Sequence, residues 1–295
     1  MTQIRRVLWP CDFSAYSDRA LRQALRLAAR HGSAVVALHV IPTSLPAPGR
    51  AGALTNPALL DPDVHERTLA ALRRFVARAA PKIPVEAEVR DGAPARVILQ
   101  RAAELPADLI VLGSHGRGGF EKWVLGSVTE RVLRSARCPV LTVPARGGLP
   151  AGPALFGTVL WATDFSAPAT AALEWALALA PEDRARLLLV HVTAHEPEPR
   201  GPDAPPDLAT ELQQRAREWL GASVPESVRS RAPVETIVAA GKAHREIVRI
   251  AAEKGAELIV MGAQGADALD QFVFGSTAQR VLRSAPCPVL TVRAG

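Results

Sequence analysis

Aromatic residues and cysteine are both scarce in this chain. Phe, Trp and Tyr make up 4% of the 295 residues, and no basic run interleaves with them, which argues against a base-stacking surface for nucleic acid. The three cysteines form no CxxC pair, so the sequence predicts neither a metal site nor a disulfide framework. A reducing compartment is the default for such a chain.

Long apolar runs are absent as well. No run approaches the ~20 residues that span a bilayer, and Met1–Arg6 leads into a strand-like run rather than into the apolar stretch of a signal peptide. We therefore expect a cytoplasmic protein with no membrane partner. The sequence also lacks GxxxxGK[ST] and, after its first strand, GxGxxG, which argues against a P-loop and against a dinucleotide fingerprint.

What the chain does contain is an internal repeat. Val7–Ser14 returns as Val159–Ser166, and Leu109–Gly113 returns as Leu258–Gly262. The offsets are 152 and 149 residues, far longer than the roughly 20–50 residues of a solenoid unit. We infer a duplicated domain. One copy covers 1–145, a linker rich in Pro and Gly covers 146–156, and the second copy covers 157–295.

The net charge of +6 is divided unevenly. Residues 1–146 hold 21 Lys and Arg against 12 Asp and Glu, a net +9, whereas the rest hold 14 against 17, a net −3. Opposite charges can help the halves to dock, or can set a basic face toward an anion. Solvated arginines on helix faces are the simpler interpretation.

Each half alternates apolar strand-like runs with amphipathic helix patterns, which is typical of a parallel α/β sheet. In the first half we expect a strand over 5–10, a mobile loop over 42–57 and a buried strand over 108–112. The last strands of the two halves, 139–143 and 288–292, would have unpaired edges, so we expect them to pair with each other.

Two glycine-rich loops share one spacing. A Gly-x2-Gly-x9-Gly-Ser pattern runs from Gly113 to Ser127 and again from Gly262 to Ser276. Each loop follows a buried strand and leads into a helix, at the sheet edge where ligands bind in open parallel sheets. Glycine lets backbone N–H groups approach an oxyanion, and a helix N-terminus favours negative charge. The pattern predicts a phosphate site.

The serines that end these loops have a second interpretation. Ser127 with Glu130, and Ser276 with Gln279, match the capping-box pattern, so each serine can simply cap its helix. Capping alone requires neither the upstream glycines nor a fixed gap of nine residues in both copies. We therefore favour phosphate binding in the first half.

Asp12 and Asp164 end the first strand of each half. A carboxylate there can accept hydrogen bonds from ribose hydroxyls, or can simply form the turn before Ser14 or Ser166 caps the next helix. Cys11 beside Asp12 is expected to be a small packed side chain rather than a nucleophile.

The histidines offer little catalytic machinery. His39 and His191 lie within apolar strands and are expected in the core or at a strand edge. His115 lies inside the first glycine loop, but the second copy has Gln264 there. A catalytic histidine also needs an orienting partner, and the sequence offers none.

These residues resemble the universal stress protein family in its tandem form, over nearly the whole chain. The Gly-x2-Gly-x9-Gly-Ser loops, typical of the ATP-binding branch, are the most specific element; the Asp-Phe-Ser segments and the Cys-Pro-Val-Leu-Thr-Val endings are similar as well. The resemblance implies two tandem copies of an open five-stranded parallel sheet, in the order 3-2-1-4-5, flanked by helices. It also implies pairing through the last strand within the chain, and it leaves a homodimer open.

The resemblance further implies ATP as the ligand. Asp12 would bind ribose, and the backbones of Cys11 and Val40 would surround adenine. The phosphates would be held by Gly113, Gly116, Arg117, Gly126, Ser127 and Val128. The matching positions of the second copy are Thr163, Asp164, Val192, Gly262, Gly265, Gly275, Ser276 and Thr277.

The second copy departs from this pattern. Arg117-Gly118-Gly119 becomes Ala266-Asp267-Ala268, so a cation is lost and a carboxylate is gained near the expected triphosphate. Arginine makes charge-assisted, forked hydrogen bonds to phosphate, so we expect the first site to be the tighter one. Mg²⁺ can accompany the triphosphate through phosphate oxygens and water.

The sequence therefore predicts an ATP-binding stress-response or signalling protein. It contains no assigned base, no nucleophile with its base and no carboxylate cluster for a catalytic metal, so we expect at most slow ATP hydrolysis. Two alternatives stay open. One is a weak ATP hydrolase or nucleotidyl transferase, with His115 as its candidate base. The other is an interaction module in which both nucleotide sites are vestigial.

Overall fold

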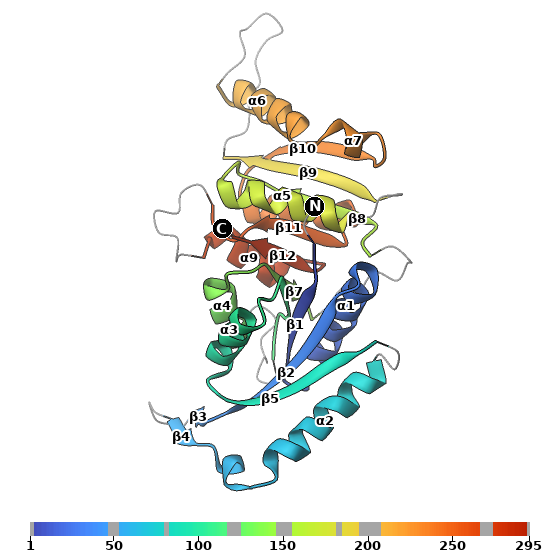
Figure 1. Cartoon of the computed structure of the whole chain (residues 1–295). Helices are drawn as coiled ribbons and strands as arrows, with labels where there is room; N and C mark the ends of the chain where they lie inside the picture. Colours follow the sequence, from blue (N-terminus) through green and yellow to red (C-terminus); the bar gives the residue numbers. More distant parts are fainter. Residues whose placement is uncertain are drawn as a thin grey trace, which may run out of the picture. The chain divides into compact units, whose positions relative to one another are not determined.

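The structure is a computed structural model of the chain. It describes residues 3–46, 53–79, 83–116, 125–145, 155–180, 185–194, 208–265 and 274–293. The chain divides into two compact units at residue 145. Each unit is an α/β domain with parallel strands and flanking helices (Figure 1).

The first unit contains one parallel sheet of five strands within its described residues. Its central strand β1 pairs with β2 on one side and with β6 on the other, while β2 also pairs with β5 and β6 with β7. The order β5-β2-β1-β6-β7 is the predicted 3-2-1-4-5. The strands are β1 (Arg6–Cys11), β2 (Ala34–Pro42), β5 (Val85–Gly92), β6 (Leu109–Gly113) and β7 (Val140–Val143). The helices are α1 (Ala15–His31), α2 (Val64–Ala79), α3 (Pro94–Glu104) and α4 (Ser127–Ser135).

The second unit repeats this topology. Its described strands follow the order β10-β9-β8-β11-β12, again all parallel, so the predicted duplication of the fold is confirmed. The strands are β8 (Thr158–Ala162), β9 (Arg186–Thr193), β10 (Val234–Ala240), β11 (Leu258–Gly262) and β12 (Val289–Val292). The helices are α5 (Ala167–Leu179), α6 (Leu208–Ser223), the short α7 (Glu226–Arg229), α8 (Ala243–Glu253) and α9 (Ser276–Ser284).

The central strands are apolar because helices cover both faces of the sheet. Val7, Leu8 and Trp9 of β1 are fully buried. The Trp9 indole N–H donates to the Ser17 carbonyl at 3.2 Å, which satisfies its one polar atom and ties the strand to the first turn of α1. Trp161 makes the same bond to Ala169 at 2.8 Å. Each copy therefore fixes its first helix against its first strand in the same way.

The segment 42–57 was expected to be a mobile loop, and that prediction is wrong in part, because some of it forms regular structure. Two short antiparallel strands, β3 (Ser44–Pro46) and β4 (Ala53–Thr55), precede the 3-10 helix η1 (Pro57–Leu60). Asn56 closes their base, because its side-chain amide donates to the Pro42 carbonyl at 2.7 Å and its backbone N–H donates to the Thr43 carbonyl at 3.1 Å. The tip, 47–52, lies outside the described residues.

The described helices include none that is both long and apolar enough to cross a membrane.

Two cysteine thiols precede the last strands of the units. Burial raises the pKa of Cys138 to about 11 and that of Cys287 to about 12. Because the thiolate is the nucleophile, iodoacetamide at pH 8 should label both cysteines far more slowly in native protein than in urea-unfolded protein. Peptide mass spectrometry measures this directly. Equal labelling rates in the two states would show that the thiols are accessible and ionise normally.

Candidate functional site

A cavity of about 730 Å³ lies in the first unit, at the carboxyl ends of β1, β2 and β6. The strand order reverses at this point, since β2 and β6 flank β1 on opposite sides. Open parallel sheets bind ligands where the order reverses. The volume is in the range of cavities that hold small molecules and cofactors.

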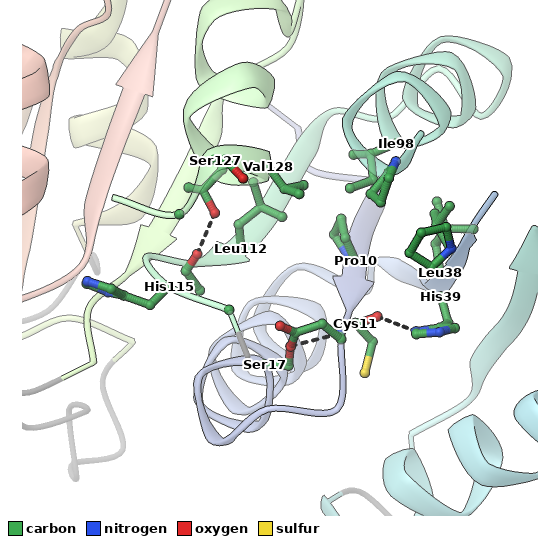
Figure 2. A pocket seen from close by; sticks show the side chains of 18 of the residues that line it. Pro10, Cys11, Ser17, Leu38, His39, Ile98, Leu112, His115, Ser127 and Val128 are labelled. Atoms are coloured by element: carbon green, nitrogen blue, oxygen red, sulfur yellow. Dashed lines mark hydrogen bonds between the residues drawn. The ribbon is translucent and has the colours of Figure 1, made fainter. Parts of the chain in front are cut away.

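The structure brings together nearly all of the residues that the sequence marked in the first copy. Eight of the nine line the cavity, and Arg117 lies outside the described residues. The eight are Cys11, Asp12, Val40, Gly113, Gly116, Gly126, Ser127 and Val128. Figure 2 shows Ser127 and Val128 across the cavity from Cys11.

Apolar side chains that the sequence analysis missed form much of the wall. Leu38, Pro94 and Ile98 line the cavity, and Figure 2 shows Leu38 and Ile98 on the side away from Ser127. The sequence did contain a signal, because the repeat has isoleucine at the same position of both copies, Ile98 and Ile247. Ile247 lines the matching pocket of the second unit. Neither isoleucine was assigned a role from the sequence.

Asp12 forms the turn that the sequence left open and also borders the cavity. Its Oδ1 accepts a hydrogen bond from the Ser14 backbone N–H at 3.0 Å and another from the Ser17 hydroxyl, which makes it a turn aspartate. Its Oδ2 faces the glycine loop, because a Cβ on Gly116 would lie 2.7 Å from that oxygen. One oxygen therefore holds the turn and the other borders the cavity.

The turn after Asp12 is held in an uncommon conformation. Phe13 has φ of 61°, in the left-handed region that bulky side chains seldom adopt. The Phe13 N–H donates to the Cys11 sulfur at 3.3 Å, and its ring packs on His39 with centroids 4.7 Å apart. Such strain persists only where surrounding contacts over-determine it, and it clusters at functional sites.

The second copy keeps this turn with different atoms. Phe165 also has φ of 61°, and its N–H donates to the Thr163 hydroxyl oxygen at 2.9 Å. Its ring packs on His191 with centroids 4.7 Å apart. Retention of the same strained turn in both copies indicates that the turn matters more than the particular acceptor.

His39 and His191, on the second strand of each sheet, hydrogen-bond to the backbone just before this turn. The Nδ1 atom of His39 lies 2.7 Å from the Cys11 carbonyl oxygen, and that of His191 lies 2.8 Å from the Thr163 carbonyl oxygen. A carbonyl only accepts, so Nδ1 carries the proton in each ring. Both histidines are half-buried strand residues that tie the end of the first strand to the second.

The glycine loops are closed at their base by backbone hydrogen bonds. The Gly126 N–H donates to the Ser114 carbonyl at 2.9 Å, and the Gly275 N–H donates to the Ala263 carbonyl at 2.9 Å. The segments between, 117–124 and 266–273, lie outside the described residues. The closed base presents the start of the following helix to the cavity.

The capping-box interpretation of Ser127 and Ser276 is wrong. The N-cap residues are Gly126 and Gly275, and neither helix has a side-chain cap. Ser127 is instead the first residue of α4, and its hydroxyl makes no hydrogen bond with another described residue. The cavity is therefore bordered by a hydroxyl and by the unpaired N–H groups of a helix N-terminus, which together suit an anion.

His115 is poorly placed to act as a base in the cavity. Its Nδ1 lies 2.8 Å from the Ser114 hydroxyl, and its ring packs against Tyr16 with centroids 5.5 Å apart. Figure 2 shows the ring projecting away from Cys11 and Ser17. His115 is among the residues that line the cavity, but its imidazole points away from Cys11 and Ser17.

The second unit has a smaller cavity of about 420 Å³ at the corresponding place. Bulkier side chains line it, with Phe274 and Met261 where the first copy has Leu125 and Leu112. All eight residues marked in this copy line the cavity: Thr163, Asp164, Val192, Gly262, Gly265, Gly275, Ser276 and Thr277. A Cβ on Gly265 would lie 2.8 Å from the Asp164 Oδ2, which repeats the geometry of Gly116 and Asp12.

Comparison with known proteins identifies the family. The model of the universal stress protein family matches residues 3–144 and again residues 155–293. The chain belongs to the universal stress protein family.

Relatives match both the whole chain and its single copies. A universal stress protein of Mycolicibacterium smegmatis is 28% identical over 97% of this chain and 96% of its own length. One from Methanocaldococcus jannaschii is 34% identical over 47% of this chain and 81% of its own length. The crystal structure of a universal stress protein from Archaeoglobus fulgidus DSM 4304 matches with a TM-score of 0.69 and 26% identity, over 98% of both chains.

One motif glycine of this universal stress protein has a packing reason of its own. A Cβ on Gly113 would lie 2.9 Å from the Cβ of Tyr16 and 3.1 Å from its backbone. Gly113→Ala should therefore push α1 away from β6 and lower the free energy of unfolding by about 1–3 kcal/mol. Urea unfolding measures the change. Gly126→Ala is the matched control, because its Cβ would make only ordinary contacts from 3.5 Å, and equal losses in the two variants would contradict the packing argument.

Proposed function

We propose that the first unit binds ATP, and that the chain uses this binding, rather than rapid turnover, in stress-response signalling. One observation carries the proposal. A single cavity at the point where the strand order reverses gathers a carboxylate oxygen, a glycine loop and an uncapped helix N-terminus. These groups match the ribose hydroxyls and the phosphates of a nucleotide.

The chemistry of the cavity assigns a place to each part of the ligand. The apolar wall of Leu38 and Ile98 suits the faces of adenine. The Asp12 Oδ2 can accept from ribose hydroxyls, since Oδ1 is engaged in the turn. The Ser127 hydroxyl and the N-terminus of α4 suit the phosphates.

Turnover is a weaker candidate than binding. General-base catalysis needs a group within hydrogen-bond reach of the attacking water, and the His115 imidazole projects away from the rest of the cavity. Steady ATP hydrolysis well above that of a site-disabled variant would favour the hydrolase alternative. No binding of ATP at all would favour the interaction module.

We further propose that the two sites are unequal. The second cavity is smaller, and Ser17, whose hydroxyl bonds to Asp12, is replaced by Ala169. The loop segment 117–124 carries Arg117, Glu121 and Lys122, a net +1, whereas 266–273 carries Asp267 and Asp270, a net −2. Both differences favour a polyanion at the first site.

Matched glycine variants test the site and its rank. A valine at position 116 displaces the Asp12 carboxylate and fills the approach to the loop, so Gly116→Val should weaken the tighter ATP binding at least about tenfold, or about 1.4 kcal/mol. Gly265→Val makes the same change in the second copy and should leave the tighter binding unchanged. Calorimetric titration with and without Mg²⁺ measures both.

Thermal melts of both variants serve as the folding control. Unchanged binding by Gly116→Val would mean that the first-site assignment is wrong. Tighter binding by the protein that keeps only its second site would reverse the ranking.

A graft tests the charge difference separately. In a chain whose first site is disabled by Gly116→Val, Ala266→Arg with Asp267→Gly should strengthen ATP binding at the second site. A direct arginine contact contributes roughly 1.5–3 kcal/mol, and most of this gain should disappear for adenosine, which has no phosphates. An equal gain for adenosine and ATP would contradict a phosphate contact.

A further inference from the structure

The outer helix of the second unit exposes large apolar side chains. Among the described residues, the exposed large apolar side chains are Leu208, at 71% exposure, Leu212, at 48%, and Trp219, at 59%, and all three lie on α6. Helical geometry advances about 100° per residue, so spacings of 4 and 11 place them within about 40° of one another. They form one stripe along the helix rather than scattered surface residues, which would need no explanation.

The first unit provides an internal comparison. Trp219 packs edge-on against Phe165, as Phe75 of α2 packs edge-on against Phe13, so α2 and α6 are equivalent helices. This equivalence puts Val64 opposite Leu208 and Thr68 opposite Leu212 in the sequence. Val64, Thr68 and Phe75 are all half-buried. The second copy alone has the exposed stripe.

The neighbouring helix α5 is also less polar than its counterpart α1 in the first unit. In α1, Asp18 and four arginines (Arg19, Arg22, Arg26 and Arg30) keep the surface charged, whereas α5 carries Glu174 as its one charged residue. α5 connects β8 to β9, and α6 connects β9 to β10, so both crossovers step in the same direction along the sheet. Because such crossovers are right-handed, α5 and α6 lie on one face of the sheet. This face is therefore much less charged than its counterpart in the first unit.

Two charged residues beside the stripe, Glu211 and Arg215, indicate which kind of partner binds to it. Glu211 and Arg215 are exposed, and neither makes an ion pair or hydrogen bond with another described residue. The acid lies one helical turn closer to the amino terminus of α6 than the base. If an identical helix packs antiparallel about a two-fold axis near residue 213, Glu211 of each copy faces Arg215 of the other. Leu208 then faces the region of Trp219. The stripe is complementary to itself.

We propose that the α6 stripe, Leu208, Leu212 and Trp219 with Glu211 and Arg215 beside them, is the docking surface for a second copy of this chain. The interface is isologous, with the same patch on both copies. One 16-residue helix, about 24 Å long, presents less than the roughly 800 Å² per partner of a standard stable interface. The dimer is therefore weak and its population depends on protein concentration.

Charge reversal of the full chain tests this pairing. E211R brings two pairs of arginines together, and R215E brings two pairs of glutamates together. Each variant alone should raise the dimer dissociation constant, measured by sedimentation velocity, at least about tenfold. Mixed in equal amounts, the two variants present opposite charges at both positions, and association should return toward that of the parent. Far-UV circular dichroism checks that α6 stays helical.

An apolar pair of variants provides the control. Leu212→Asp should abolish association, whereas Thr68→Asp, at the equivalent position of α2, should leave it unchanged. A parent that stays monomeric at every concentration overturns the proposal. So does a dimer that neither charge reversal weakens, because another surface then forms it. A mixture that associates no better than its components also overturns it, because the partner of α6 is then another segment or another protein.

Discussion

The close approach of the glycine loop to the turn after the first strand is the constraint on which each site depends. Gly113 lies against Tyr16 and Gly262 lies against the backbone of Ala169, in both cases closer than a Cβ would allow. Gly116 lies against the Asp12 carboxylate in the same way. Contacts within the protein thus account for the first two glycines of the motif. This approach places the start of α4 and the Asp12 carboxylate at the edge of one cavity.

This constraint explains both the success and the failure of the sequence-based analysis. Apolar runs such as 109–112 and the repeat itself predicted the sheet, since burial on both faces leaves little choice of residue. The repeat spacing also predicted which residues meet at the cavity. The sequence pattern assigned the loop glycines to phosphate binding alone. It could not show that Gly113 also packs against α1, because that contact depends on distances in the folded chain. Ile98 was missed for the same reason, since helix periodicity shows that a residue is inward but not that it borders a cavity.

The capping-box rule failed at α4, where Gly126 and Ser127 are both possible N-cap residues. The serine in Gly-Ser-Val-Thr-Glu matches a capping box, yet Gly126 is the N-cap, so the helix begins at Ser127, one residue earlier than the pattern suggests. At Ser14 the same rule succeeded, because the turn aspartate accepts the Ser14 N–H and thereby holds that residue outside the helix. Whether a serine caps its helix therefore depends on the residues before it: Asp12 holds Ser14 outside α1, whereas Ser127 follows the N-cap Gly126 and lies inside α4.

Duplication lets the two copies diverge in different parts of one fold. The second copy retains the strained turn while losing the Ser17 and Thr129 hydroxyls, of which the latter donates to the Gly113 carbonyl in the first copy. Its own changes lie in two helices, in the low charge of α5 and in the apolar stripe of α6. The larger cavity thus lies in the first copy, and the less polar surface lies in the second.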